Sequence, residues 1–319
     1  IIGVDGATIN GNGAGRFATI TKGATLTDLN IINCLSTGSQ VYGGAISNSG
    51  SSTLTVERCN FTNNTVFGVT RGNGGVIDND GGTVYIYNST FINNTATVSD
   101  SASYRKNAAD GGAISNLGKL YVYNTLFESN SALRNGGAIR AQGSSTYIEN
   151  CAFIANYATG HESGGSYGGA FYSWGEPFNV YNSTFMANWA YDVMGNNCNG
   201  GALYGVRVTD TNIIGCDFEG NSAGGKTGST GQSIFLESTK AKINYCVIDT
   251  TLYANGNSID ANNNWWDTNT PDFSQIFESG SKVITPTSYA VLNITTDSTT
   301  TPEMNITVSL SWNDGTQTD

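Results

Sequence analysis

The sequence predicts an all-β fold: a right-handed parallel β-helix, a solenoid of about eight coils, followed by a short C-terminal β segment. Two short signatures recur about every 30 residues, and the runs between them are alternating or β-branched, separated by Gly and Asn. No segment shows a helical period. A unit this short cannot bury its own apolar side, whereas stacked copies share one continuous core. We therefore expect the solenoid over residues 1–285 and a separate β segment over residues 286–319.

The first 30 residues supply β runs at 17–20 and 26–32 without the full signatures, so we expect them to form an opening coil. The first signature then begins, a Gly-Gly pair followed by a small residue and an apolar one. Paired Gly mark a bend that needs positive φ or close backbone approach, which makes them poor candidates for a phosphate-binding loop. The copies begin at Gly43, Gly74, Gly111, Gly136, Gly168 and Gly200, with a degraded copy at Gly231.

The second signature is an aliphatic residue, then Cys, Ser or Thr three later, Phe two later and Asn three later. Stacking predicts an interior ladder of Phe rings and a column of Asn at a bend, where amides hydrogen-bond along the stack. The copies are Val56/Cys59/Phe61/Asn64, Ile86/Ser89/Phe91/Asn94, Val122/Thr125/Phe127/Asn130, Ile148/Cys151/Phe153/Asn156, Val180/Ser183/Phe185/Asn188 and Ile213/Cys216/Phe218/Asn221, with weaker edges at Ile31/Cys34 and Ile243/Cys246/Ile248.

Five of the six cysteines are assigned to the Cys/Ser/Thr column: Cys34, Cys59, Cys151, Cys216 and Cys246. A column that also accepts Ser and Thr requires a small side chain, so we expect buried thiols rather than disulfides. The alternative is a pair on successive coils, Cys34 with Cys59 or Cys216 with Cys246, close enough for a disulfide. Cys198 lies in a loop between repeats and is expected to react with maleimide.

The far end of the solenoid carries a cluster of bulky aromatics near residues 262–277, including Trp265, Trp266 and Phe273, and we expect an end cap there. Residues 286–319 then alternate apolar and polar side chains, as two or three strands of an incomplete immunoglobulin-like domain would. A lone hairpin leaves its edges and one face uncovered. Three structures could cover that apolar face: the rest of a truncated domain, the solenoid itself, or strands of another chain.

Charge and composition exclude several partners and favour an extracellular setting. The formal net charge of −11 disfavours nucleic acid and anionic lipid, and no run is apolar enough to span a membrane. Because the chain opens with Ile1-Ile2-Gly3, we expect a mature or excised segment. Seven sequons are candidate glycosylation sites, although a chain rich in Asn, Ser and Thr also produces sequons by chance. They begin at Asn60, Asn63, Asn88, Asn93, Asn182, Asn293 and Asn305.

The residues give little support to catalysis, so we expect no enzyme and no cofactor. Polysaccharide-cleaving enzymes share this fold, but glycoside hydrolysis needs two carboxylates facing one bond. The single histidine, His161, lies beside Glu162 in a loop and is more simply solvated. Asp78 and Asp80 form a weak calcium candidate, for which a turn stabilised by Asp side chains before Gly81 is the simpler interpretation.

The insertions carry the functional signal. Length varies between the Asn column and the next Gly-Gly, so the inserted segments should emerge from one edge of the solenoid and form a loop-bearing face. Aromatic and basic side chains there suit sugar stacking or a protein partner, or else they shield the coil edge. The candidate binding residues are Tyr104, Arg105, Lys106, His161, Tyr167, Trp189 and Tyr191.

The repeats resemble those of the chlamydial polymorphic outer-membrane proteins, with Gly-Gly-Ala-Ile and Phe-x-x-Asn motifs as at Gly111 to Ile114 and Phe127 to Asn130. They are also similar to the adhesin-like surface proteins of methanogenic archaea. Those proteins carry the same repeats, an Asn-Trp-Trp segment as at Asn264 to Trp266, and immunoglobulin-like repeats opening as at Tyr289 to Ile294.

The resemblance covers nearly the whole chain and implies an extracellular, archaeal, cell-surface glycoprotein that acts in cell adhesion. The expected function is display of the loop-bearing face to a cell-surface protein or glycan of another cell, or to neighbouring copies of the chain. Two alternatives remain: a polysaccharide lyase or hydrolase of the β-helix class, and a structural subunit of a surface layer or fibre.

Overall fold

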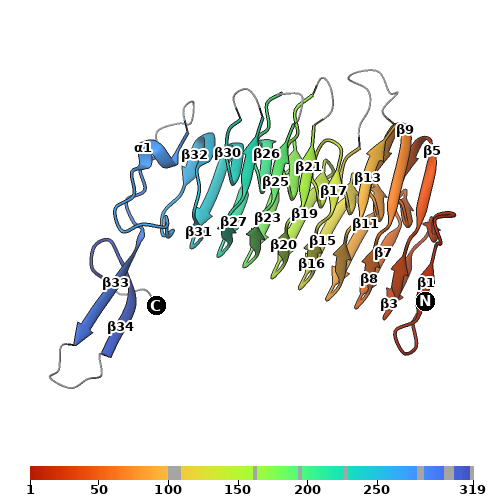
Figure 1. Cartoon of the computed structure of the whole chain (residues 1–319), viewed down its shortest axis with the longest axis horizontal. Helices are drawn as coiled ribbons and strands as arrows, with labels where there is room; N and C mark the ends of the chain where they lie inside the picture. The colour runs from red at the N-terminus through yellow and green to blue at the C-terminus, as the bar shows by residue number, and fades with distance from the viewer. Residues whose placement is uncertain are drawn as a thin grey trace.

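The computed structural model describes residues 1–99, 109–160, 164–192, 196–225, 229–278, 284–297 and 305–316. The chain winds into a row of stacked coils that runs from the N-terminal coil to a small C-terminal hairpin (Figure 1). Within the described residues, no helix is long and apolar enough to cross a membrane.

Three sheets run along the solenoid. In the nine-stranded sheet the strands are β1 (Thr8–Asn10), β4 (Asn30–Ile32), β8 (Asn60–Thr62), β12 (Thr90–Ile92), β16 (Leu126–Glu128), β20 (Ala152–Ile154), β24 (Thr184–Met186), β28 (Asp217–Glu219) and β31 (Val247–Ile248). In the seven-stranded sheet they are β5 (Leu35–Tyr42), β9 (Thr65–Asn73), β13 (Thr95–Val98), β17 (Ser131–Ala132), β21 (Tyr157–Thr159), β25 (Trp189–Tyr191) and β29 (Ser222–Gly224).

The sixteen-stranded sheet has two rows that join at the long strand β30 (Ile234–Asn244), which also pairs with β32 (Leu252–Asp260). The row after the Gly-Gly bends holds β2 (Ala18–Ile20), β6 (Ile46–Ser49), β10 (Ile77–Asp80), β14 (Ile114–Asn116), β18 (Ile139–Ala141), β22 (Phe171–Trp174) and β26 (Leu203–Val208). The other row holds β3 (Ala24–Thr27), β7 (Thr53–Glu57), β11 (Thr83–Tyr87), β15 (Lys119–Tyr123), β19 (Ser145–Glu149), β23 (Phe178–Tyr181) and β27 (Thr211–Ile214).

Every strand pair in these three sheets is parallel, and equivalent positions of successive repeats lie opposite one another. Phe61, for example, pairs with Phe91, and Phe91 pairs with Phe127 in the next coil. This register confirms the predicted parallel β-solenoid followed by a short antiparallel β pair.

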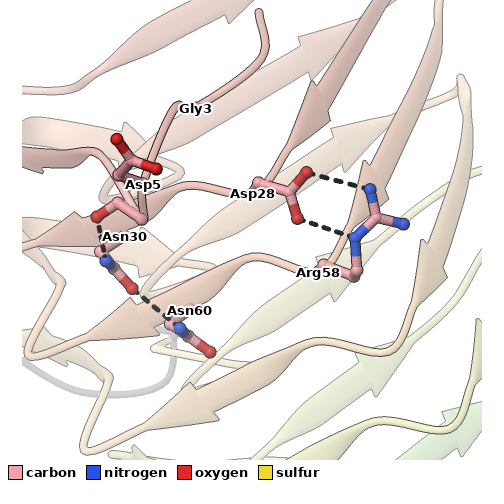
Figure 2. A pocket seen from close by; sticks show the side chains of 7 residues that line it. Gly3, Asp5, Asp28, Asn30, Arg58 and Asn60 are labelled. Carbon is pink, nitrogen blue, oxygen red and sulfur yellow. Dashed lines mark hydrogen bonds and ion pairs between the residues drawn. The ribbon is translucent and has the colours of Figure 1, made fainter.

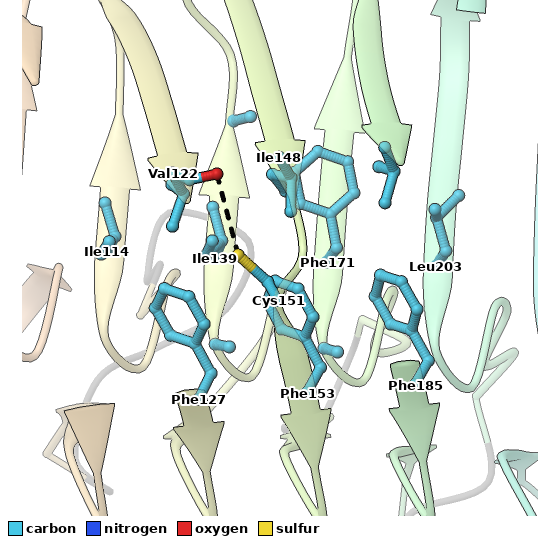
Figure 3. Packing of buried hydrophobic residues seen from close by; sticks show 14 of the residues in the cluster. Ile114, Val122, Phe127, Ile139, Ile148, Cys151, Phe153, Phe171, Phe185 and Leu203 are labelled. Atoms are coloured by element: carbon cyan, nitrogen blue, oxygen red, sulfur yellow. Dashed lines mark hydrogen bonds between the residues drawn. The ribbon is translucent and has the colours of Figure 1, made fainter. Parts of the chain in front are cut away.

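The phenylalanine ladder (Phe61, Phe91, Phe127, Phe153, Phe185 and Phe218) forms the centre of the core. All six side chains are fully buried, and successive ring centroids lie 4.7 to 4.9 Å apart in near-parallel stacks. Figure 3 shows three of these rings beneath the aliphatic side chains of the adjacent strands. Ile31 and Ile248 occupy the same position in the first and last strands of the ladder.

The asparagine ladder (Asn64, Asn94, Asn130, Asn156, Asn188 and Asn221) lies at the next bend and is equally buried. The amide nitrogen of Asn94 donates to Asn130 Oδ1 at 2.9 Å and to the carbonyl of Phe61 at 3.1 Å, and this pattern repeats from coil to coil. Each oxygen also accepts the backbone N–H of the preceding Asn. The buried polar groups at this bend are therefore hydrogen-bonded to one another. A solenoid requires this at a bend where no loop opens to solvent.

The Gly-Gly bends are imposed by backbone contact. Gly43 has φ +71°, and a Cβ on Gly44 would lie 2.0 Å from the carbonyl oxygen of Gly75 in the next coil. The same clash recurs between Gly75 and Gly112. A side chain at the second position of these copies would collide with the backbone of the next coil, so this signature is structural; Gln232 takes that position in the degraded last copy.

The predicted cysteine column is wrong at one end. Cys59, Cys151, Cys216 and Cys246 share it with Ser89, Thr125 and Ser183, but Leu29 precedes Cys59 there, because Asn30 pairs with Asn60. Cys34 instead lies in the asparagine column, where its N–H donates to Asn64 Oδ1 at 3.0 Å. All six cysteines are free thiols, as predicted.

Cys198 is also fully buried, which contradicts its predicted exposure. Its Sγ accepts a hydrogen bond from Ser166 Oγ at 3.3 Å, and burial raises the pKa of the thiol. The loop that holds it folds back against the neighbouring coil, since Thr230 N donates to the Cys198 carbonyl.

Trp266 closes the far end of the core. It is buried against Phe273, the first residue of α1 (Phe273–Ile276), and Phe277, which follows that helix; α1 is the single helix of the described residues. The hairpin β33 (Ala290–Asp297) and β34 (Asn305–Trp312) follows and is antiparallel. It attaches through Tyr289, which pairs with Asn264 and packs on Phe273. The immunoglobulin-like character of residues 286–319 stays a prediction.

Candidate binding surface

The structure brings together two of the seven predicted binding residues. Trp189 and Tyr191 lie on the outer face of the seven-stranded sheet, in β25. Tyr104, Arg105, Lys106 and His161 fall outside the described residues. Tyr167 lies elsewhere and is considered below.

Trp189 and Tyr191 form an exposed aromatic patch with the neighbouring Tyr157 of β21. Trp189 is 48% exposed and Tyr191 41%. The Trp189 ring lies 5.8 Å from Tyr157 and 6.3 Å from Tyr191, at interplanar angles of 49° and 44°. Because the rings are tilted rather than stacked, their faces are not covered by one another. Such an arrangement can pack on a sugar ring or anchor a protein partner.

Local strand geometry sets this orientation. Trp189 pairs with Tyr157, and Ala158 pairs with Ala190, in neighbouring strands. The two alanines face inward and are buried, so the flanking aromatic positions must face outward. The small inward residues allow the seven-stranded sheet to lie close to the Gly-Gly bends, since a Cβ on Gly169 would meet the backbone of Trp189 at 2.5 Å.

Tyr167 serves packing instead. Its ring lies 4.9 Å from that of Tyr204, in a satellite cluster with Tyr172, Val206 and Phe235. Its N–H donates to the carbonyl of Arg134, whose guanidinium pairs with the buried Asp110 at 2.7 Å. Burial raises the pKa of the Tyr167 hydroxyl. These contacts favour a structural role for this predicted binding residue.

The calcium candidate does not assemble. Asp78 and Asp80 belong to strand β10 rather than to a turn, and Asp78 is buried while Asp80 is exposed. Within the part of the chain that the structure describes, no group of three His, Cys, Asp or Glu could hold a metal ion. Burial raises the pKa of Asp78 to about 7, with Arg140 and Arg16 opposing the shift.

The solenoid sequons lie at the surface. Asn60, Asn63, Asn88, Asn93 and Asn182 are exposed, and all but Asn60 adopt a positive φ at a bend. Asn60 is already engaged, since it donates to Asn30 and accepts from Thr90. Asn293 in β33 donates to Ser311 Oγ, and Asn305 is the first residue of β34.

A small polar pocket of about 310 Å³ lies in the N-terminal coils (Figure 2). It is lined by Asp5, Asp28, Asn30, Arg58 and Asn60, together with Gly3 and Gly6. Arg58 forms a two-pronged ion pair with Asp28, at 2.7 and 3.0 Å, and this hydrogen bonding lowers the pKa of the carboxyl. The pair already satisfies the charges of Arg58 and Asp28, so the pocket offers a ligand the Asp5 carboxylate, amides and backbone.

The molecule has a second aromatic surface that was not predicted. We call it the tyrosine face; it consists of Tyr85, Tyr87, Tyr121, Tyr123, Tyr147 and Tyr181. These side chains are half-buried on the outer side of β11, β15, β19 and β23. Neighbouring rings lie 5.0 to 5.6 Å apart between coils. Tyr85 stacks on Tyr121 and Tyr87 on Tyr123, whereas Tyr147 is tilted against both Tyr123 and Tyr181. The Tyr-x-Tyr alternation around Ile86 and Val122 was the available signal.

A shallow groove of about 460 Å³ runs beside this face, at the bend between the sixteen-stranded and nine-stranded sheets. We call it the amide groove, because three exposed Asn side chains line one side. Its lining residues are Asn124, Thr125, Leu126, Asn150, Cys151, Ala152, Asn182 and Thr184.

Comparison with known proteins gives one match. Residues 88–117 and 124–142 match the family model of the Chlamydia polymorphic membrane protein repeat. These segments contain β12 to β14 and β16 to β18, so the match covers repeats from the middle of the solenoid. No curated protein and no solved structure matches the chain.

Proposed function

We propose that this chain is the repeat region of a cell-surface, adhesin-like protein that binds a protein or glycan of another cell through the aromatic patch. The match to a polymorphic membrane protein repeat supports the surface location. The resemblance to adhesin-like proteins of methanogenic archaea supports the adhesive role and the archaeal origin. The observation that carries the binding role is the exposed, tilted cluster of Tyr157, Trp189 and Tyr191 on a rigid sheet.

Energetics favour this patch as an anchor. Aromatic side chains lose little conformational entropy on binding and bury a large area, so a few of them supply most of the affinity at many interfaces. Parallel strands fix Trp189 and Tyr191 through their backbone pairing with Tyr157 and Thr159. A partner would therefore meet a preorganised surface.

The test is binding of fluorescent protein to a panel of whole cells and to a glycan array. The double variant Trp189→Ala with Tyr191→Ala should bind at least tenfold more weakly, because it removes both exposed rings. The matched control is Met186→Ala with Tyr245→Ala, which removes two exposed large apolar side chains that lie outside the seven-stranded sheet. Equal binding by both double variants would contradict the proposal.

We propose further that binding occurs without turnover. The aromatic patch consists of uncharged side chains, whereas glycoside hydrolysis needs two carboxylates facing one bond. Pectin, alginate and xylan should remain uncut after incubation with the protein, with or without calcium. New reducing ends or unsaturated uronates would instead support the lyase or hydrolase alternative.

A further inference from the structure

The amide groove presents a repeated polar chemistry. Tyr123, Glu149 and Tyr181 pair in register across β15, β19 and β23, and each is followed directly by Asn124, Asn150 or Asn182. The three Asn adopt φ of +49°, +54° and +47°, so the same bend recurs in each coil. Their amides therefore recur at the strand spacing of about 4.8 Å. Asn124 already donates one N–H to Asn88 Oδ1 at 3.1 Å. Its second N–H and the amides of Asn150 and Asn182 offer donors and acceptors, as sugar hydroxyls do.

The two walls of the groove differ. One side is the row of Asn124, Asn150 and Asn182, which directly follows the end of the tyrosine face in the chain. Tyr147 donates to Glu149 at 3.0 Å, and burial together with that carboxylate raises the pKa of Tyr147 to about 12, so the hydroxyl stays protonated. The opposite side consists of Leu126, Ala152 and Thr184, which belong to the outer face of the nine-stranded sheet.

Charge selects among polymers that could lie there. All the lining residues are uncharged. Two acidic residues lie next to the groove. Glu149 directly precedes Asn150, and Asp217 pairs with Thr184 on the next strand. An anionic polymer would meet repulsion both there and from a chain of net charge −11.

We propose that the amide groove binds a neutral, linear polysaccharide that lies along the solenoid axis. A polymer of hydroxyl-bearing rings matches a surface that repeats its amides and hydroxyls from coil to coil. The site is separate from the aromatic patch and goes beyond the function proposed for it.

Affinity electrophoresis in gels that contain hydroxyethylcellulose, mixed-linkage glucan, galactomannan or dextran tests the proposal, with polygalacturonate as the anionic probe. At least one neutral polymer should retard the protein, and polygalacturonate should not. The double variant Asn124→Asp with Asn150→Asp should bind at least tenfold more weakly, because each substitution keeps the bend, removes a donor and adds a charge.

The matched control is Asn63→Asp with Asn93→Asp. These residues are also exposed with positive φ, but they lie at another bend, and the charge change is the same. The control should keep the wild-type affinity. Tyr123→Phe with Tyr181→Phe removes only hydroxyls and should also weaken retention, which covers the case in which the Asp variants fold poorly.

Three outcomes would overturn the proposal: no retardation by any neutral polymer, equal loss in the Asp double variant and its control, or stronger retardation by polygalacturonate. The variant Trp189→Ala with Tyr191→Ala should keep its retardation. Failure of this site is thus distinguishable from failure of the aromatic patch.

Discussion

Single buried carboxyl groups give the protein an unusual response to pH. Asp78 and Glu176 are both buried, and desolvation raises each pKa to about 7. For Glu176 the nearby Arg140 only partly opposes the shift. Such groups favour the folded state when they are protonated and oppose it when they are ionised.

We predict that the free energy of unfolding falls as pH rises from about 4 to about 7. At pH values below the pKa that Asp has in the unfolded state, the folded and unfolded states bind the same number of protons. Between that value and the folded pKa of about 7, the folded state binds more, so stability decreases with pH. Asp78→Asn removes this term and should raise stability at pH 8 by roughly 2 to 4 kcal/mol relative to its effect at pH 4. Urea unfolding at both pH values measures this; an equal effect at both would contradict it.

A second prediction at the residue scale concerns the thiols. All six cysteines, Cys198 included, should resist maleimide in the native protein, because each thiol is buried away from the reagent. For Cys151, burial raises the thiol pKa to about 12. Mass spectrometry after labelling, with and without denaturant, reads this directly. Rapid native labelling of Cys198 would show that its loop opens.

At the scale of elements, the ladders determine how stability is distributed along the solenoid. Phe127 and Phe153 have stacked rings on both sides, whereas Ile248 occupies the last place of the column. A cavity at a central position cannot be filled by neighbouring rings, because their backbones are held by the parallel pairing.

Phe127→Ala or Phe153→Ala should therefore cost roughly 3 to 5 kcal/mol of unfolding free energy, and Ile248→Ala should cost less. Denaturant titration of the three variants compares them. Equal and negligible losses would show that this column does not determine core packing.

The hairpin of β33 and β34 is the element with the least support. Leu292 pairs with Leu310 and Ile294 with Val308, so these apolar residues share one face, and Ile294, Val308 and Leu310 are exposed. Residues up to Leu292 are joined to the end of the solenoid. Ala290 N donates to the Asn264 carbonyl, and the backbone of Leu292 exchanges two hydrogen bonds with the Asn269 amide.

Truncation after Leu292 should leave the melting temperature of the solenoid and its oligomeric state unchanged, because the hairpin beyond that point contributes little to the core. Calorimetry and light scattering measure the two quantities. An assembly that dissociates on truncation would identify the hairpin as a polymerisation element.

For the whole molecule, the sequence was sufficient to predict the core and bend positions that recur in every coil, and it was insufficient for features outside those positions. The Phe, Asn and Gly-Gly columns were predictable because each position needs one kind of side chain in every coil. Cys34 was misplaced because Ile31 stands where later coils have Phe, and the spacing from Ile31 to Cys34 matches that from Val56 to Cys59. The tyrosine face was missed because its strands were interpreted through their inward residues alone. Cys198 was misjudged because loop burial depends on contacts between coils that spacing does not encode.

The central claim is that the aromatic patch on the seven-stranded sheet contacts the partner. Hydroxyl-radical footprinting of the protein on cells that bind it tests this most directly, since exposed Trp and Tyr side chains react and contact protects them. Oxidation of Trp189 and Tyr191 should fall on binding, while Tyr245, which is exposed elsewhere, should be oxidised as in the free protein. Undiminished oxidation of Trp189 and Tyr191 in the bound protein would contradict the claim.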